Sequence, residues 1–151
     1  MSYILTKQRN ANVKAAFEKY ALYLKENERS FPKGAYELAT SDWWFNFNNH
    51  RCPHDSWLEK FEIMEHSQGE RNEIRWSNIV ITLLGAYHDS LLTIEYSAVC
   101  NYRLECDSGH GDWLFDQFLC SDDGDVIHEI EWSRSHWIIH CKDIEFSYKK
   151  I

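Results

Sequence analysis

The sequence lacks the features that would place it in a membrane or in a secretory pathway. It contains no run approaching the roughly 18 apolar residues that a membrane-spanning helix needs, so we expect no membrane association. Its first residues, MSYILTKQRN, lack the apolar block and the small-residue cleavage site of a secretory signal, so we expect a cytoplasmic protein. There is no linker, repeat array or low-complexity segment, and the 151 residues fit one domain, 1–151.

The common motifs of catalytic and nucleotide-binding sites are also missing. There is no glycine-rich phosphate loop, no Gly-x-Ser-x-Gly elbow and no His-Glu-x-x-His sequence. The five cysteines are widely spaced and include no Cys-x-x-Cys pair, which favours free thiols in a reducing compartment over a disulfide scaffold. The sequence therefore implies no cofactor.

Basic residues are scarce in the second half of the chain. Residues 1–75 contain 11 Lys/Arg and 11 Asp/Glu, whereas residues 76–151 contain 5 and 13, so the second half carries the whole net charge of −8. This excess of negative charge repels nucleic acid and attracts basic partners. The alternative is that the acidic residues serve only solubility.

Helical periodicity is confined to residues 1–41. An apolar stripe at the spacing of one helix face predicts a helix, which Asn10 or Asn12 can cap and Pro32 ends. The sequence PKGAYELAT predicts a second, short helix. The stripe consists of Val13, Ala16, Phe17, Tyr20, Ala21 and Leu24.

Residues 42–151 show the alternation of β-strands. It begins at Trp43, and further strands are predicted from IRWSNIVITLL, LLTIEYSAV, NYRLEC, DWLFDQFLC, DVIHEIEW and HWIIHCKDIEFSY. Because no helical segment interrupts the series, successive strands are expected to be antiparallel neighbours. The prediction is an α+β fold in which N-terminal helices pack on a seven- to eight-stranded, mainly antiparallel meander sheet.

The last hairpin has a predicted register. If residues 133–136 form the loop, Trp132 faces Trp137, Ile130 faces Ile139 and His128 faces Cys141, with all six on one side and Glu129 opposite His140 on the other. His128 is then predicted to be a hydrogen-bonded core residue. Near Lys142–Asp143 the alternation shifts by one residue, for which a β-bulge is expected.

Four short segments place a histidine within two residues of an acid: CPHDS, AYHDS, HGDW and HEIEW. Adjacent side chains of a strand point to opposite faces, so His88 and Asp89 would not face each other in extended structure. Turn chemistry is the preferred interpretation for the two His-Asp-Ser triplets, in CPHDS and AYHDS, because Asp and Ser bond nearby backbone amides where a strand begins or turns. A functional surface and a catalytic His-Asp pair are the alternatives.

A metal site is the hypothesis for the stretch HRCPHD. His50, Cys52 and His54 would share one face of an extended chain, and His140 or Cys141 could complete the ligands. Pro53 and the missing second ligand pair argue against it. Asp123-Gly124 in SDDGDV is explained by a tight turn rather than by a calcium loop.

Acidic residues interspersed with aromatics suggest a surface that recognises a basic protein. The alternative is that the aromatic residues point inward and the acids are merely solvated. The predicted partner-binding residues are Asp89, Asp107, Asp112, Asp116, Asp122, Asp123, Asp125, Glu129, Glu131 and Trp113.

Over residues 42–147, the segments HDSWLEKFEI, ITLLGAYHDSLLTIEYSAV, GHGDWLFDQFLCSDDGDVIHEIEW and WIIHCKDIEF resemble small bacterial immunity proteins of polymorphic-toxin and contact-dependent inhibition loci. The resemblance implies a non-enzymatic, cytoplasmic protein that neutralises a basic toxin domain, for example a nuclease, by steric and electrostatic blockade. Two alternatives stay open: a metal-dependent or hydrolytic enzyme centred on His50, Cys52 and His54, and a structural or oligomerisation domain.

Overall fold

The N-terminal part of the chain is helical. A computed structural model describes residues 2–151, apart from the side chain of Lys7. None of the helices in this range has the length and apolarity that a membrane crossing requires. The helices are α1 (Thr6–Ala11), α2 (Val13–Glu26), the 3-10 helix η1 (Glu28–Ser30) and α3 (Lys33–Ala39).

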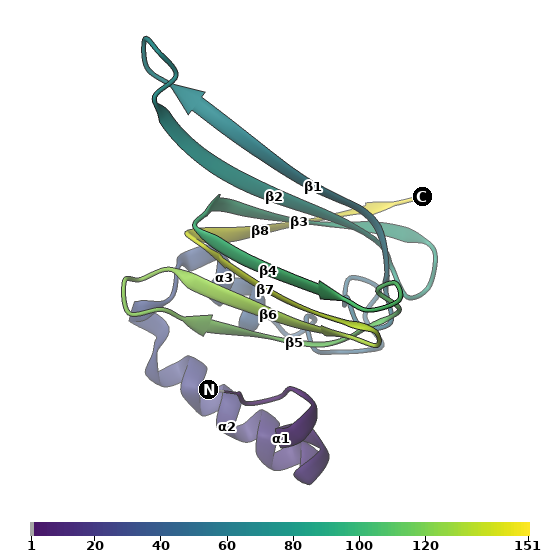
Figure 1. Ribbon diagram of the computed structural model, residues 1–151. Helices are drawn as coiled ribbons and strands as arrows, with labels where there is room; N and C mark the ends of the chain where they lie inside the picture. Colours follow the sequence, from purple (N-terminus) through teal and green to yellow (C-terminus); the bar gives the residue numbers. More distant parts are fainter. Residues whose placement is uncertain (1) are drawn as a thin grey trace.

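Helix α2 follows the predicted stripe over a narrower face than expected. The Asn12 side chain caps it by accepting a hydrogen bond from the Ala15 N–H. The buried residues are Ala16, Tyr20 and Leu24, whereas Val13 and Ala21 are exposed. The helix lies below the sheets in Figure 1, against strand β5 (Trp113–Cys120), and Phe17 and Tyr23 are partly buried against the core beside the three buried residues.

The strand expected to begin at Trp43 does not exist. Residues 41–56 form a series of turns, in which the Asn46 and Asn49 side chains accept hydrogen bonds from the backbone N–H groups of Asn48 and Arg51. These Asn side chains compete with strand pairing for the backbone amides, which alternation of apolar residues alone does not reveal.

The rest of the chain forms eight strands, and every pairing between them is antiparallel. The α+β class is confirmed, but the strands form two four-stranded sheets rather than one meander: β1-β2-β3-β8 (the first sheet) and β4-β7-β6-β5 (the second sheet) (Figure 1). The strands other than β5 are β1 (Trp57–Gln68), β2 (Ile74–Leu84), β3 (Ser90–Val99), β4 (Asn101–Cys106), β6 (Val126–Trp132), β7 (Ser135–Cys141) and β8 (Asp143–Lys150).

The chain passes between the two sheets at two single residues. Cys100 separates β3 from β4, and Lys142 separates β7 from β8. The two corners are joined, because the Cys100 N–H donates to the His140 carbonyl and the Lys142 N–H to the Ser97 carbonyl. The shift of alternation near Lys142–Asp143 therefore marks a corner between sheets, where a bulge within one sheet was expected.

The predicted register of the last hairpin is wrong by two residues. Ile130 lies opposite Trp137 and His128 opposite Ile139, so the loop contains only Ser133 and Arg134. Two backbone hydrogen bonds hold this tight turn: the Ser133 N–H donates to the Asp112 carbonyl, and the Arg134 N–H donates to the His110 carbonyl. Glu129 accordingly lies opposite Ile138, not His140. A shift of two residues leaves each side chain on the same face, so the predicted buried face is correct.

Beyond the end of β3, the β1–β2 hairpin projects from the body as a two-stranded arm, residues 64–76 (Figure 1). His66 lies opposite Trp76 and Gln68 opposite Ile74, so these side chains share one face with Met64. Met64, Ile74 and Trp76 are all exposed.

Helix α3 contacts the edge strands β8 and β5 of the two sheets. Asp143 fixes its start, since its two carboxylate oxygens accept hydrogen bonds from the Gly34 and Ala35 N–H groups, at 3.1 and 2.9 Å. A Cβ atom at Gly34 would lie 2.4 Å from the Ile144 carbonyl oxygen, so the close contact of α3 with β8 requires glycine there.

Two tyrosines of α2 cover the open edge of β5. The Tyr20 hydroxyl accepts a hydrogen bond from the Phe118 N–H and donates one to the Phe118 carbonyl, at 2.6 and 2.9 Å. The Tyr23 hydroxyl accepts a hydrogen bond from the Cys120 N–H. Burial raises the pKa of Tyr20 well above its usual range, so its hydroxyl stays protonated. The helix thus satisfies backbone groups that an edge strand otherwise exposes.

We expect Tyr20→Phe to lower the free energy of unfolding by about 1–3 kcal/mol, because it leaves a buried N–H and a buried carbonyl of β5 without partners. Urea denaturation measures the change. Tyr36→Phe is the matched control, since it removes a hydroxyl that caps no strand edge among residues 2–151. Equal stability of the two variants would contradict the capping role.

Candidate functional site

Aromatic and histidine side chains gather at the end of the molecule where β1 begins and β2 meets β3. They come from the turns of residues 41–56, from the first residue of β1 and from the turn between β2 and β3. These segments lie at the right of Figure 1, opposite the arm. We call this surface the aromatic end and define it by Phe47, His50, His54, Trp57, Tyr87 and His88.

The rings of the aromatic end contact one another in three pairs. His50 stacks on Tyr87 with ring centres 4.0 Å apart, and His54 stacks on Phe47 at 3.7 Å. The third pair, Trp57 with His88, is tilted, with ring centres 4.6 Å apart. The Tyr87 hydroxyl also donates a hydrogen bond to the Phe47 carbonyl, which ties the two loops together.

Three carboxylates border these rings. Asp89 Oδ2 lies 2.6 Å from His50 Nδ1, and the Trp57 indole N–H donates to Asp112 Oδ1 at 2.7 Å. Asp55 Oδ2 lies 3.5 Å from His54 Nε2. The hydrogen bond from His50 lowers the pKa of Asp89 below its usual range, so this carboxylate stays ionised into more acidic conditions. The aromatic end therefore combines exposed rings with oriented negative charge.

The interpretation of the His-Asp segments as turns is confirmed for CPHDS and AYHDS. In the second segment the Gly85 N–H donates to the Ser90 carbonyl and the His88 N–H to the Gly85 carbonyl. His88 and Asp55 have positive φ angles, of 58° and 63°, as turn residues can. Asp89 of AYHDS pairs with His50, which lies two residues before CPHDS and 39 residues from Asp89 in the sequence.

The structure does not assemble the predicted metal site. His50 bonds Asp89, His54 Nδ1 lies 2.6 Å from the Leu114 carbonyl, and the Cys52 thiol donates to the Trp44 carbonyl. Burial raises the pKa of Cys52 to about 12, which disfavours the thiolate that a metal requires. Cys141, a proposed additional ligand, is also buried, and its pKa is likewise raised to about 12 by burial. All five cysteines are free.

The ten predicted partner-binding residues do not form one surface. Asp89, Asp107 and Asp112 lie at the aromatic end, whereas Asp122, Asp123 and Asp125 lie in the β5–β6 turn at the opposite end of the second sheet (Figure 1). On the outer face of that sheet, Glu129 pairs with His136 and Glu131 with Arg9. Trp113 and Asp116 are buried, so they cannot belong to an exposed contact surface.

Asp116 belongs instead to a polar network inside the core. Its Oδ2 accepts a hydrogen bond from the Trp44 indole N–H at 2.8 Å and lies 2.7 Å from His128 Nε2. The Trp113 indole N–H donates to Oδ1 at 3.3 Å. His128 Nδ1 lies 2.6 Å from the Tyr96 hydroxyl, so the prediction that His128 is a hydrogen-bonded core histidine is confirmed. Burial raises the pKa of Tyr96 well above its usual range.

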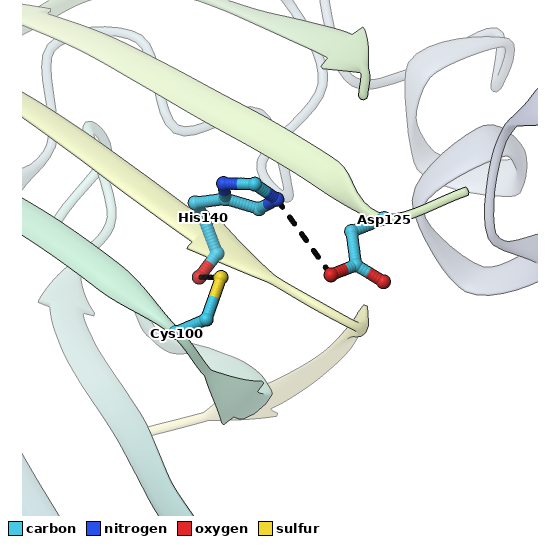
Figure 2. Close-up of side chains that lie close together, drawn as sticks. All are labelled: Cys100, Asp125 and His140. Carbon is cyan, nitrogen blue, oxygen red and sulfur yellow. Dashed lines mark hydrogen bonds and ion pairs between the residues drawn. The ribbon is translucent and has the colours of Figure 1, made fainter. Parts of the chain in front are cut away.

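Sequence reasoning missed a second cluster at the opposite end of the molecule. Cys100, Asp125 and His140 bring together one sulfur, one carboxylate oxygen and one ring nitrogen, all within 4.8 Å of one another (Figure 2). His140 was one of two possible additional ligands for His50, Cys52 and His54, but its Nε2 atom lies 3.6 Å from Asp125 Oδ2. Cys100 carried no local signal, because only the corner between β3 and β4 brings it to His140.

Comparison of the chain with families of known proteins, with characterised proteins and with experimentally determined structures gave no match.

We expect Asp116→Ala to lower the free energy of unfolding by about 3–5 kcal/mol, because it leaves the donors of Trp44, Trp113 and His128 buried without their acceptor. Chemical denaturation followed by tryptophan fluorescence measures the loss. Asp122→Ala, at an exposed position, is the control and should change stability by no more than about 0.5 kcal/mol. If both variants are equally stable, the network does not anchor the core.

We expect the Asp89 carboxyl to titrate at a higher pH in His50→Gln than in the wild type, because the variant loses the imidazole that lowers its pKa. Carbon-detected NMR of the carboxyl follows this titration. The folded pKa of Asp89 is lowered, so its stabilising contribution is present above the unfolded value of about 3.9 and is lost as pH falls through the folded value. Identical titration curves would exclude the His50–Asp89 pair in solution.

Proposed function

We propose that this chain is a non-enzymatic binding protein of the immunity type, which occludes a basic toxin domain with its aromatic end. The observation that carries the proposal is the exposure of three aromatic side chains on one surface bordered by acids. Phe47, Trp57 and Tyr87 are 44%, 47% and 47% exposed. They lie beside carboxylates rather than inside the core, as aromatic anchors of protein interfaces do.

The stacked arrangement suits this role. Each exposed ring contacts a histidine ring, and two of the histidines also contact a carboxylate, so the rings are held in place before a partner arrives. An interface formed from ordered side chains loses less conformational entropy on binding than one formed from mobile chains. The three aromatic rings can therefore act as anchors, with Asp55, Asp89 and Asp112 as the polar rim.

The charge of the chain supports a basic partner. The net charge of −8 speeds the approach of a positively charged domain, and Asp107 adds to the acids of the loop that carries Asp112. Bound there, the chain would block the basic surface of a toxin by occupying it and neutralising its charge. The contact centre we propose lies at Trp57 and Tyr87, and not in the acidic segment 122–131.

A role in self-association has one observation in its favour, the arm. Its exposed Met64, Ile74 and Trp76 lie on one face of a ribbon that projects from the body. Light scattering during gel filtration decides whether copies associate through it. The enzymatic alternative has no such support, since His50, Cys52 and His54 each bond a different partner.

We expect Trp57→Ala and Tyr87→Ala each to weaken binding to the toxin domain encoded beside this chain's gene by about 30-fold or more, as loss of an interface anchor does. Isothermal titration calorimetry measures the affinity, and thermal unfolding verifies that each variant is folded. Trp76→Ala is the matched control, because Trp76 is also an exposed tryptophan but lies on the arm.

The proposal fails if no complex forms at micromolar concentration with that toxin domain. It also fails if a complex forms but Trp76→Ala weakens it while Trp57→Ala and Tyr87→Ala do not.

A further inference from the structure

We propose that Cys100, Asp125 and His140 form a binding site for a divalent transition metal of the zinc class, with Asp123 as the neighbouring fourth group. This site lies at the end of the second sheet opposite the aromatic end and does not depend on the proposed function.

The backbone holds the three ligands from three separate elements. Cys100 occupies the corner between β3 and β4, and its N–H donates to the His140 carbonyl at 2.9 Å. His140 lies in β7, opposite Ile127 of β6, which places it beside the start of β6. Asp125 immediately precedes β6 and is held by the turn, since its N–H donates to Ser121 Oγ and its carbonyl accepts from the Ser121 N–H. The positions of the ligands are therefore set by the fold.

The distance between His140 Nε2 and Asp125 Oδ2 matches the spacing of two ligands on one tetrahedral metal ion better than that of a hydrogen-bonded pair. His140 Nε2 lies 3.6 Å from Asp125 Oδ2 and 3.9 Å from Asp123 Oδ1, both too long for hydrogen bonds. Ligands about 2.0–2.3 Å from a tetrahedral zinc ion lie roughly 3.3–3.8 Å from one another. His140 Nε2 is also inaccessible to solvent and has no hydrogen-bond partner among the described residues. Buried polar atoms without a partner are uncommon, and a bound metal ion would give His140 Nε2 a partner.

The orientation of the side chains agrees with this reading. Figure 2 shows a ring nitrogen of His140 directed at the Asp125 carboxylate and the Cys100 sulfur beside the His140 carbonyl oxygen. The thiol now lies 3.5 Å from the His140 carbonyl oxygen.

The ligand atoms, one sulfur, one ring nitrogen and one carboxylate oxygen, determine which metal the site prefers. A thiolate and an imidazole are ligands for zinc and similar transition metals, whereas calcium and magnesium prefer oxygen ligands alone. Bound there, the ion would join the β5–β6 turn to the corner at which the chain changes sheets. The expected role is therefore to fix this end of the protein.

Cobalt(II) and zinc(II) titrations of protein purified without a histidine tag test the site. We expect one cobalt ion per chain, with the thiolate-to-cobalt absorption band of a cysteine ligand, and displacement of that band by zinc. Cys100→Ser should abolish the band, and His140→Gln should weaken metal binding by at least about tenfold. Cys106→Ser is the matched control, because Cys106 is an exposed thiol at the other end of β4 and should leave the band unchanged.

Alkylation followed by mass spectrometry gives a second measurement on the wild-type protein. Zinc should protect Cys100 from iodoacetamide and leave Cys106 reactive. The proposal is overturned if no cobalt–thiolate band appears, if Cys100→Ser retains it, or if zinc protects neither thiol. His50→Gln should bind metal like the wild type, and loss of binding in that variant would place the metal at the aromatic end instead.

Discussion

The hydrogen bonds of the buried Asp116 side chain hold the two sheets and the turns of residues 41–56 in their relative positions. The carboxylate accepts hydrogen bonds from Trp44 in the turns of residues 41–56 and from Trp113 in β5, and it pairs with His128 in β6. His128 in turn contacts Tyr96 of β3, so the network joins both sheets to an irregular segment that has no strand pairing of its own. That segment carries Phe47, His50 and His54, and the position of the aromatic end consequently depends on the hydrogen bonds of the buried Asp116 side chain.

The two sheet corners are the second constraint. Because β3 continues into β4 and β7 continues into β8, the same ribbon of chain belongs to both sheets, and a core forms between them without a long connection. The corners lie side by side through the bond of the Cys100 N–H to the His140 carbonyl. The same bond brings the Cys100 thiol to the cluster with Asp125. A requirement of the fold thus creates the geometry of the proposed metal site.

Alternation of apolar residues predicted the buried faces of β6 and β7 and most strand positions, because the side-chain period of a strand is two. It could not determine the pairing of these strands, since a shift of two residues preserves the alternation. It also predicted a strand at Trp43, where Asn side chains bond the backbone and form turns.

The count of charged residues predicted a negatively charged surface, but it could not predict where each acidic side chain lies. Asp116 is in the core, and Asp123 lies at the opposite end of β5 from Asp112. The pairing of His50 with Asp89 spans 39 residues, which no local pattern encodes.

Antiparallel topology explains why turn residues become the candidate sites. Each hairpin connection lies at one of two ends of a sheet, so polar and aromatic residues that terminate strands far apart in sequence accumulate at the same end. For this reason the aromatic end brings together CPHDS, AYHDS and HGDW. A hydrogen bond from the Trp57 indole N–H to Asp112 joins the residue that follows CPHDS to HGDW. The opposite end collects the β5–β6 turn and the corner at Cys100. The two His-Asp-Ser segments form turns, and their side chains lie together because the strands that they join are packed side by side.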